Sequence, residues 1–138
     1  MSATEAKAAV VTVTESGLGP YGQIVMSGHH VLGADEPETS GGHDTGPDPF
    51  AHVMAGLGAC TAMTIRMYAA RKGWTLDRVT VRVSHEKRGA LARHLFKREI
   101  MLHGPVDEQQ RGRMTEIAEH CPVHKLLQEG AEIETTLG

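Results

Sequence analysis

The chain has 138 residues, of which 40% are hydrophobic and 22% are charged, a composition close to that of ordinary globular domains. This length favours one domain over residues 1–138, and a chain of this size buries enough surface to fold without disulfide bonds. Fourteen Lys and Arg residues against seventeen Asp and Glu residues give a net charge of −3, which argues against a general nucleic-acid or anionic-membrane binder.

The first third of the chain predicts three short strands and one long loop. Residues 8–14 are rich in β-branched side chains, residues 21–27 alternate between apolar and polar, and residues 29–34 follow as a third strand. Residues 35–49 contain three prolines and three glycines within fifteen positions, so they predict a loop. Loops of this length in small domains often carry function or border a site.

The strongest periodic signal predicts a long helix over residues 50–71. Apolar residues recur at helical spacing along this segment, and over most of its length the other faces are small or apolar as well. A helix that is apolar around most of its circumference belongs in a core. Gly56 and Gly58 lower its helix propensity, and we expect them to permit the close approach of another backbone segment. Lys72 and Gly73 predict the end of the helix.

A β-hairpin is predicted after this helix. Residues 76–85 alternate between apolar and polar side chains, which is typical of a strand with one solvated face. Residues 95–103 alternate less regularly and are predicted to be the partner strand, with Gly89 in the connection.

The C-terminal part of the chain predicts two helices and a last strand. Residues 107–120 show helical spacing, with Asp107 as the N-cap and Gln110 as its capping-box partner. A short helix over residues 122–128 begins with a proline, and residues 131–136 predict a strand. This order of elements indicates an α+β domain.

The cysteine count and the apolar stretches indicate the cellular compartment. Cys60 and Cys121 are the only cysteines, too few for a disulfide-stapled secreted scaffold. Residues 1–7 lack the charged and apolar regions of a signal peptide. The longest mostly apolar stretch, residues 50–63, contains His52 and is too short to span a bilayer. We therefore expect a cytoplasmic protein whose thiols are kept reduced.

The positions of the two cysteines suggest chemistry. Cys60 lies in the middle of the predicted long helix, where a cysteine is most often a small core hydrophobe. Cys121 directly precedes Pro122, at the start of the short helix, where backbone N–H groups and the helix dipole lower the pKa of a thiol. Two thiols in a protein that needs no covalent staple favour a chemical role.

Two interpretations use these cysteines. In the first, one thiolate is oxidised and the other thiol condenses with it, which gives a reversible disulfide. In the second, Cys121 and His124 bind a metal ion, because their spacing suits metal ligands and His120 adjoins them. A structural zinc site normally needs four ligands in close pairs, and Cys60 has no paired ligand nearby, so the redox interpretation is favoured.

Two blocks, each centred on one cysteine, resemble the signature of the OsmC/Ohr family, the osmotically inducible and organic hydroperoxide resistance proteins. The first block comprises residues 46–49 and 57–64, and it continues through residues 66–69 and 72–74. The second block is residues 116–124. The similarity covers nearly the whole chain and fits an OsmC-like branch of the family.

This resemblance implies an OsmC-like α+β fold, with antiparallel strands around a central buried helix and two chains intertwined in a homodimer. It also implies a thiol peroxidase of the oxidative stress response that acts on organic hydroperoxides. Cys60 would attack the peroxide and Cys121 would resolve the product, and a dithiol reductant, lipoyl-type or a small thiol, would reduce the resulting disulfide. No metal and no organic cofactor are implied.

An alternative function keeps the same fold without peroxidase activity. Peroxidases of this family place an arginine and a glutamate beside the first cysteine, whereas the first arginine of this chain is Arg66. Phe50, Val53 and Met54 offer an apolar lining for a small ligand. The alternative is therefore an OsmC-like dimer that binds a small ligand or senses redox state.

Overall fold

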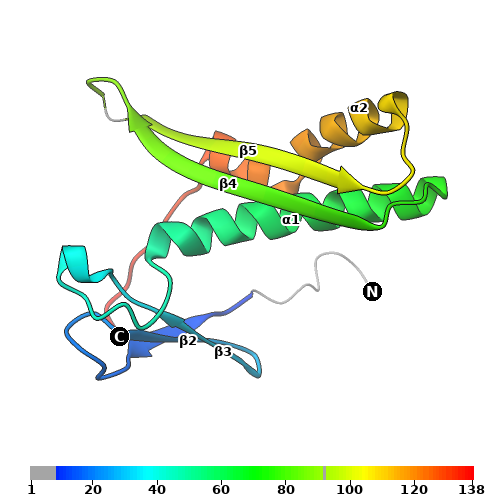
Figure 1. Cartoon of the computed structure of the whole chain (residues 1–138). Helices are drawn as coiled ribbons and strands as arrows, with labels where there is room; N and C mark the ends of the chain where they lie inside the picture. The colour runs from blue at the N-terminus through cyan, green and yellow to red at the C-terminus, as the bar shows by residue number, and fades with distance from the viewer. Residues whose placement is uncertain (1–8, 92) are drawn as a thin grey trace. The chain divides into compact units, whose positions relative to one another are not determined.

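The computed structural model describes residues 9–91 and 93–138, and the chain divides into two compact units, Met1–His52 and Val53–Gly138. Residues 1–7, for which no signal peptide is predicted, lie outside the described residues. The described elements combine small antiparallel sheets with helices, which confirms the predicted α+β class (Figure 1).

The first unit contains a three-stranded antiparallel sheet. Its strands are β1 (Thr12–Glu15), β2 (Gln23–Ser27) and β3 (His30–Ala34), and they lie in that order. All three predicted strands are therefore present; residue 8, where the first was predicted to begin, lies outside the described residues, and residues 9–11 are not part of β1. Within the predicted loop that follows, a single short 3-10 helix, η2 (Glu38–Ser40), interrupts an otherwise irregular backbone.

The buried carboxylate of Asp35 organises this loop. Its Oδ2 accepts hydrogen bonds from the hydroxyl and the backbone N–H of Thr45, at 2.7 and 3.0 Å, and its Oδ1 accepts one from the backbone N–H of Glu36 at 2.7 Å. The hydroxyl of Thr45 has the largest effect and, with the backbone N–H groups, holds the pKa of Asp35 below its usual value, although burial opposes the shift. Asp35 is thus tied to Thr45, ten residues further along the loop.

The substitution Asp35→Asn is expected to lower the melting temperature at neutral pH by a few degrees. Because the pKa of Asp35 is lower in the folded state, its carboxylate stabilises the fold above the unfolded-state pKa, and this contribution is lost as the pH falls through the folded-state pKa. The difference from the wild type should therefore shrink in acid, as thermal unfolding at neutral and acidic pH would measure.

Glu38→Gln is the matched control, because Glu38 is an exposed carboxylate of the same loop. It should unfold like the wild type at both pH values. A deficit in Asp35→Asn that is the same at neutral and acidic pH would contradict the role given to the carboxylate.

The long helix α1 (Pro49–Lys72) begins in the first unit and continues through the second. The sequence predicts it to within one residue at each end. Arg71 and Lys72 lie in its last turn, and Gly73 ends it with a φ of +70°, a conformation that glycine adopts most readily. Among the described residues, α1 is the one helix that is long and apolar enough to cross a membrane, a property that the core helix of a soluble protein can share.

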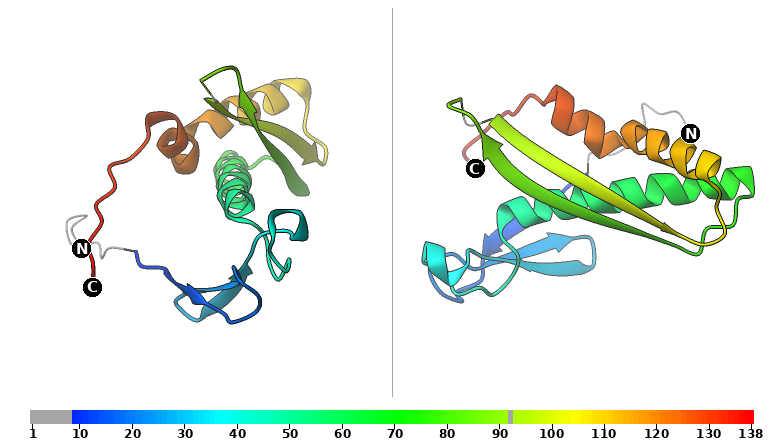
Figure 2. Two further views of the ribbon diagram at one scale, coloured as in Figure 1. Left: turned by 90° about the vertical axis from the view of Figure 1, so that its left-hand side faces the viewer. Right: turned by 45° about the horizontal axis from the view of Figure 1, so that its top comes forward.

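A two-stranded hairpin and further helices complete the second unit (Figure 2). The antiparallel strands β4 (Arg78–Arg88) and β5 (Arg93–His103) follow α1. They are succeeded by α2 (Glu108–Ile117), the 3-10 helix η3 (Ala118–His120) and α3 (Pro122–Glu129). The capping box of Asp107 and Gln110 is present, with bonds of 2.8 and 3.0 Å, as predicted.

The core of this unit forms where one face of α1 meets the apolar side of the hairpin and α2. Ile65 and Met114 are fully buried at its centre. The remaining buried members are Tyr68, Ala69, Leu76, Val106 and Ala118, and the partly buried residues packed against them are Trp74, Val79, Ile100, Leu102 and Ile117.

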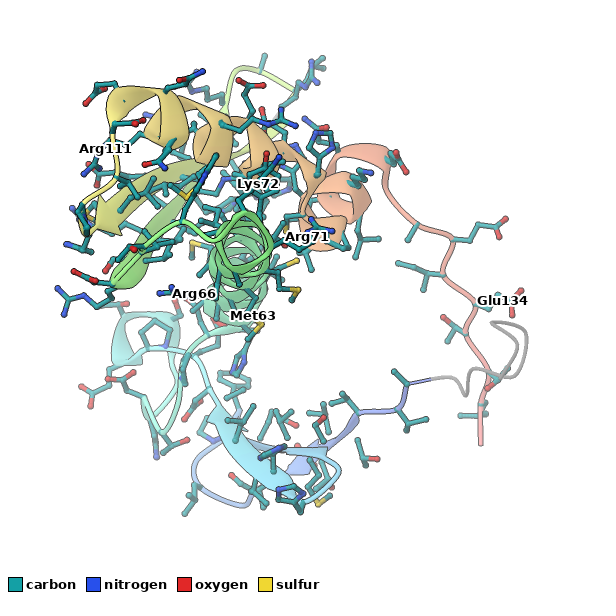
Figure 3. All side chains as sticks on the ribbon, turned by 90° about the vertical axis from the view of Figure 1, so that its right-hand side faces the viewer. Met63, Arg66, Arg71, Lys72, Arg111 and Glu134 are labelled. Carbon is teal, nitrogen blue, oxygen red and sulfur yellow. The ribbon has the colours of Figure 1, made fainter. Side chains whose placement is uncertain are left out.

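The opposite face of α1 is exposed. Met63 and Met67 are 59% and 63% exposed, and Figure 3 shows Met63 on the side of the helix opposite α2. A Cβ at Gly58 would contact Val83 at 3.4 Å, in keeping with the expected close approach, whereas one at Gly56 would meet nothing within 4 Å. Within the described residues, α1 therefore buries one apolar face in the core and leaves the other apolar face exposed.

The predicted last strand is wrong. Residues 131–136 are extended, but no described strand pairs with them, and Ile133 is 88% exposed. A strand is stabilised by its neighbours, so β-branched composition alone does not make one. Figure 3 shows Glu134 on this extended segment, beyond α3.

Candidate functional site

The structure brings Cys60 and Cys121 together. Cys60 lies in the middle of α1, and Cys121 is the residue immediately before α3, as predicted. Both are free thiols, and their side chains are in hydrogen-bonding contact although 61 residues separate them in the sequence. Cys121 is fully buried, whereas Cys60 keeps partial solvent exposure. The two thiols therefore form a pair in which one sulfur is accessible and the other is not.

The surroundings of Cys121 favour its ionised form. Burial has the largest single effect and by itself raises the pKa. The hydrogen bond from Cys60, the backbone N–H groups of His124 and Val123, and the hydroxyl of Thr61 together outweigh it, so the pKa of Cys121 lies below its usual value. These N–H groups belong to the first turn of α3, where a helix stabilises negative charge.

Cys60 is affected in the opposite direction. Burial raises the pKa of its thiol most, and the hydrogen bond that it donates to Cys121 and the charge on that sulfur raise the pKa further. The backbone N–H of Val123 and the hydroxyl of Thr64 oppose this shift without reversing it. The pair therefore titrates as one unit, and the opposite directions of the two pKa shifts favour the negative charge on Cys121.

A second group of polar side chains surrounds this pair, centred on Arg98 of β5. Its Nη1 donates to Oγ1 of Thr61 at 3.0 Å. Its Nη2 donates to Oε2 of Glu119 at 3.0 Å and to Nδ1 of His124 at 3.1 Å. The acceptor role of Nδ1 places the ring hydrogen of neutral His124 on Nε2. Arg98 thus joins α1, the segment before Cys121 and the first turn of α3.

The sequence interpretation missed Arg98, Thr61 and Glu119, although it contained a signal for Arg98. In β5, Phe96, Arg98 and Ile100 have the spacing of one strand face, and Ile100 packs against the core. A cation in such an apolar series indicates a buried ion pair or hydrogen-bond network. The partners of Arg98 could not be deduced, because they come from other elements.

An open pocket of about 880 Å³ adjoins this network. Arg98 and His124 are among its lining residues, together with Phe96 of β5 and Leu57 of α1. The other lining residues come from β5, the adjoining turn, η3 and α3: Arg93, His94, Leu95, Glu119, Leu127, Gln128 and Glu129. The pocket therefore combines an apolar wall with cationic groups, and it shares Arg98, Glu119 and His124 with the network around the cysteine pair.

The metal interpretation finds no support in this geometry. Over residues 9–91 and 93–138, no three or more His, Cys, Asp or Glu side chains are grouped so that they could hold an ion. The Nδ1 atom of His124 instead accepts the hydrogen bond from Arg98, which directs that nitrogen to the Arg98 network.

Comparison with known proteins relates the sequence and the fold of this chain to one family. A model of the OsmC-like protein family matches residues 42–136. A search of curated proteins found no match. Among solved structures, an OsmC-like protein from Mycoplasma pneumoniae is 19% identical, is matched over 88% of this chain and 88% of its own, and has a TM-score of 0.73.

Two further solved structures show the same fold. A putative osmotic stress induced and detoxification response protein from Psychrobacter arcticus is 17% identical over 87% of this chain and 88% of its own, with a TM-score of 0.74. An organic hydroperoxide resistance protein of Bacillus subtilis is 20% identical over 88% of this chain and 91% of its own, with a TM-score of 0.62. Since the family model matches well over half of the sequence, the chain belongs to the OsmC-like protein family.

Proposed function

We propose that the protein is a thiol peroxidase that reduces organic hydroperoxides through a reversible disulfide between Cys60 and Cys121. The observation that carries this proposal is the contact between two free thiols from distant parts of the chain. One of them is accessible and the other stabilises negative charge, which a two-cysteine cycle requires. Structural neighbours named as organic hydroperoxide resistance proteins add support from the fold.

The cycle begins from the singly ionised pair. Cys60 passes its hydrogen to the thiolate of Cys121, and the Cys60 thiolate attacks the O–O bond. Cys60 becomes a sulfenic acid, and the departing alkoxide takes a proton to give an alcohol. Cys121 then attacks the Cys60 sulfur, which forms the disulfide and releases water. The dithiol and the hydroperoxide thus give a disulfide, an alcohol and water, without a metal or an organic cofactor.

A dithiol reductant closes the cycle, either of the lipoyl type or a small thiol, by exchange with the disulfide. The pocket beside Arg98 suits the organic part of the substrate, because Leu57, Leu95, Phe96 and Leu127 give it apolar surface. We place this activity in the cytoplasm, as part of an oxidative stress response, where other thiols supply the reducing equivalents.

The proposal includes a homodimer in which residues 1–138 of each chain act as one OsmC-like domain. Coverage of almost nine tenths of both chains in the structural comparisons supports the single domain. The exposed face of α1 supports the dimer, because small and flexible apolar residues repeat along it at helical spacing. The members of this exposed α1 face are Gly56, Ala59, Met63, Met67 and Ala70.

Intact-mass spectrometry of the reduced protein after one equivalent of cumene hydroperoxide tests the activity. We expect the loss of two hydrogens within the mixing time and peptide mapping of the new bond to Cys60 and Cys121. Reduced glutathione treated in parallel is the control. Oxidation of the protein no faster than that of the free thiol would overturn the proposal.

The second candidate, a small-ligand-binding or redox-sensing module, is favoured by the size of the pocket. It predicts a small molecule that copurifies with the protein, and peroxide turnover that Cys60→Ser leaves unchanged. Ligand-free protein with turnover that depends on Cys60 would exclude it.

A further inference from the structure

Arg98 occupies a position where an apolar residue is expected. It pairs with Val83 in the hairpin register, and its side chain is only 13% exposed. Withdrawing a guanidinium from water is costly unless its N–H groups find acceptors. The placement of Arg98 therefore requires a compensating set of contacts.

The contacts of Arg98 concentrate around the cysteine pair. Its three hydrogen-bond acceptors, on Thr61, Glu119 and His124, all lie within three residues of a cysteine in the sequence. Its ion pair with Glu119 gives little stability, since that carboxylate is 63% exposed and solvated ion pairs contribute only about 0–1 kcal/mol. Stabilisation of the fold through this ion pair therefore does not explain the buried position of Arg98. The contact of Arg98 with the buried hydroxyl of Thr61 points to another role.

Thr61 is the fully buried link between Arg98 and the sulfurs. Its hydroxyl oxygen accepts from Arg98 at 3.0 Å, and the hydroxyl donates to the carbonyl of Leu57 at 2.7 Å. The same hydroxyl is also one of the groups that lower the pKa of Cys121. A guanidinium can only donate, so Arg98 keeps the Thr61 oxygen in the acceptor role. The single hydroxyl hydrogen is left to point to Leu57 or to Cys121.

We propose that Arg98 is a positioning residue for the cysteine pair, which directs the hydroxyl of Thr61 toward Cys121 when that sulfur is ionised. With Cys121 as a thiol, the hydroxyl donates to the carbonyl of Leu57. With Cys121 as a thiolate, the hydroxyl turns to the sulfur and makes a stronger, charge-assisted bond, while the carbonyl retains its helical hydrogen bond. This inference deepens the proposed function and rests on it for its biological purpose.

Ultraviolet titration of the thiolate in the fully reduced protein tests the inference without any peroxide. Arg98→Met and Thr61→Val should both move the first thiol ionisation to higher pH. The thiolate fraction at neutral pH should then fall roughly three- to tenfold, as expected for a shift of up to about one pH unit. The double variant should show no further shift, because both changes remove the same interaction. Arg98→Lys keeps a hydrogen-bond donor and a positive charge, so its first thiol ionisation should lie between that of the wild type and that of Arg98→Met.

Glu119→Gln is the matched control, because it removes the ion pair and leaves the bond from Arg98 to Thr61 in place. It should not move the first ionisation to higher pH. Titration curves of Arg98→Met and Thr61→Val that match the wild type, or shifts that add in the double variant, would overturn the inference. If Arg98→Met does not fold, Thr61→Val and Arg98→Lys give the same test.

The thiol titration and the peroxide assay test the positioning role and the proposed peroxidase independently. A titration that depends on Arg98, in a protein that does not turn over hydroperoxide, would uphold the positioning role and overturn the proposed peroxidase. Peroxide turnover by a protein whose thiol titration does not depend on Arg98 would uphold the proposed peroxidase and overturn the positioning role.

Discussion

Replacing Cys60 with serine should lower the rate of organic hydroperoxide reduction by roughly a thousandfold or more, since removal of a nucleophile costs at least that much in comparable enzymes. Cys60 is the sulfur with solvent exposure, so it is the one that a hydroperoxide can reach. A serine hydroxyl has a similar size but does not attack the O–O bond. Stopped-flow measurement of alcohol formation with cumene hydroperoxide, at equal concentrations of both proteins, would show the loss.

Cys121→Ser is the informative comparison. It should still consume one equivalent of hydroperoxide but stop at the sulfenic acid of Cys60, which a dimedone probe would trap. Attack by this variant should also require a higher pH, because burial, the largest cause of the raised pKa of Cys60, remains and the thiolate of Cys121 no longer removes its proton. If Cys121→Ser abolishes the first turnover and Cys60→Ser preserves it, the two roles are exchanged.

Local signals in the sequence were sufficient for the helices around this site. Helical periodicity predicted α1, the Asp107 capping box predicted the start of α2, and the proline after Cys121 predicted the start of α3. Each signal acts within a few neighbouring residues, through side-chain spacing, a hydrogen bond or the fixed φ of proline. The position of each cysteine relative to its own helix could therefore be predicted.

The surroundings of the cysteines depend on residues far apart in the sequence. Arg98 reaches Thr61 across 37 positions and His124 across 26, so neither contact leaves a periodic trace. The last predicted strand failed for a related reason, since strand composition does not supply a neighbour to pair with. The family resemblance implied that Cys60 and Cys121 pair in a disulfide, but it did not indicate which cation lies near them.

The second prediction concerns the assembly of the homodimer through the exposed α1 face. Met67→Glu should convert the proposed homodimer to a monomer. Met67 is 63% exposed and lies one turn from Met63 on the exposed α1 face, so a dimer packed on this face would bury both side chains. Burying an unpaired carboxylate costs several kcal/mol, and each 1.4 kcal/mol weakens the dissociation constant about tenfold.

Sedimentation velocity over a dilution series would measure this effect, with an expected rise of the dissociation constant of at least about a hundredfold. Leu91→Glu is the control, because it adds the same charge at an 86% exposed position in the turn between β4 and β5. It should sediment like the wild type. Since α1 also carries Cys60, monomeric Met67→Glu that still forms the Cys60–Cys121 disulfide would show that one chain contains the whole redox pair. A variant that remains as dimeric as the wild type would place any interface elsewhere, because a charge within the exposed α1 face cannot be buried without a partner.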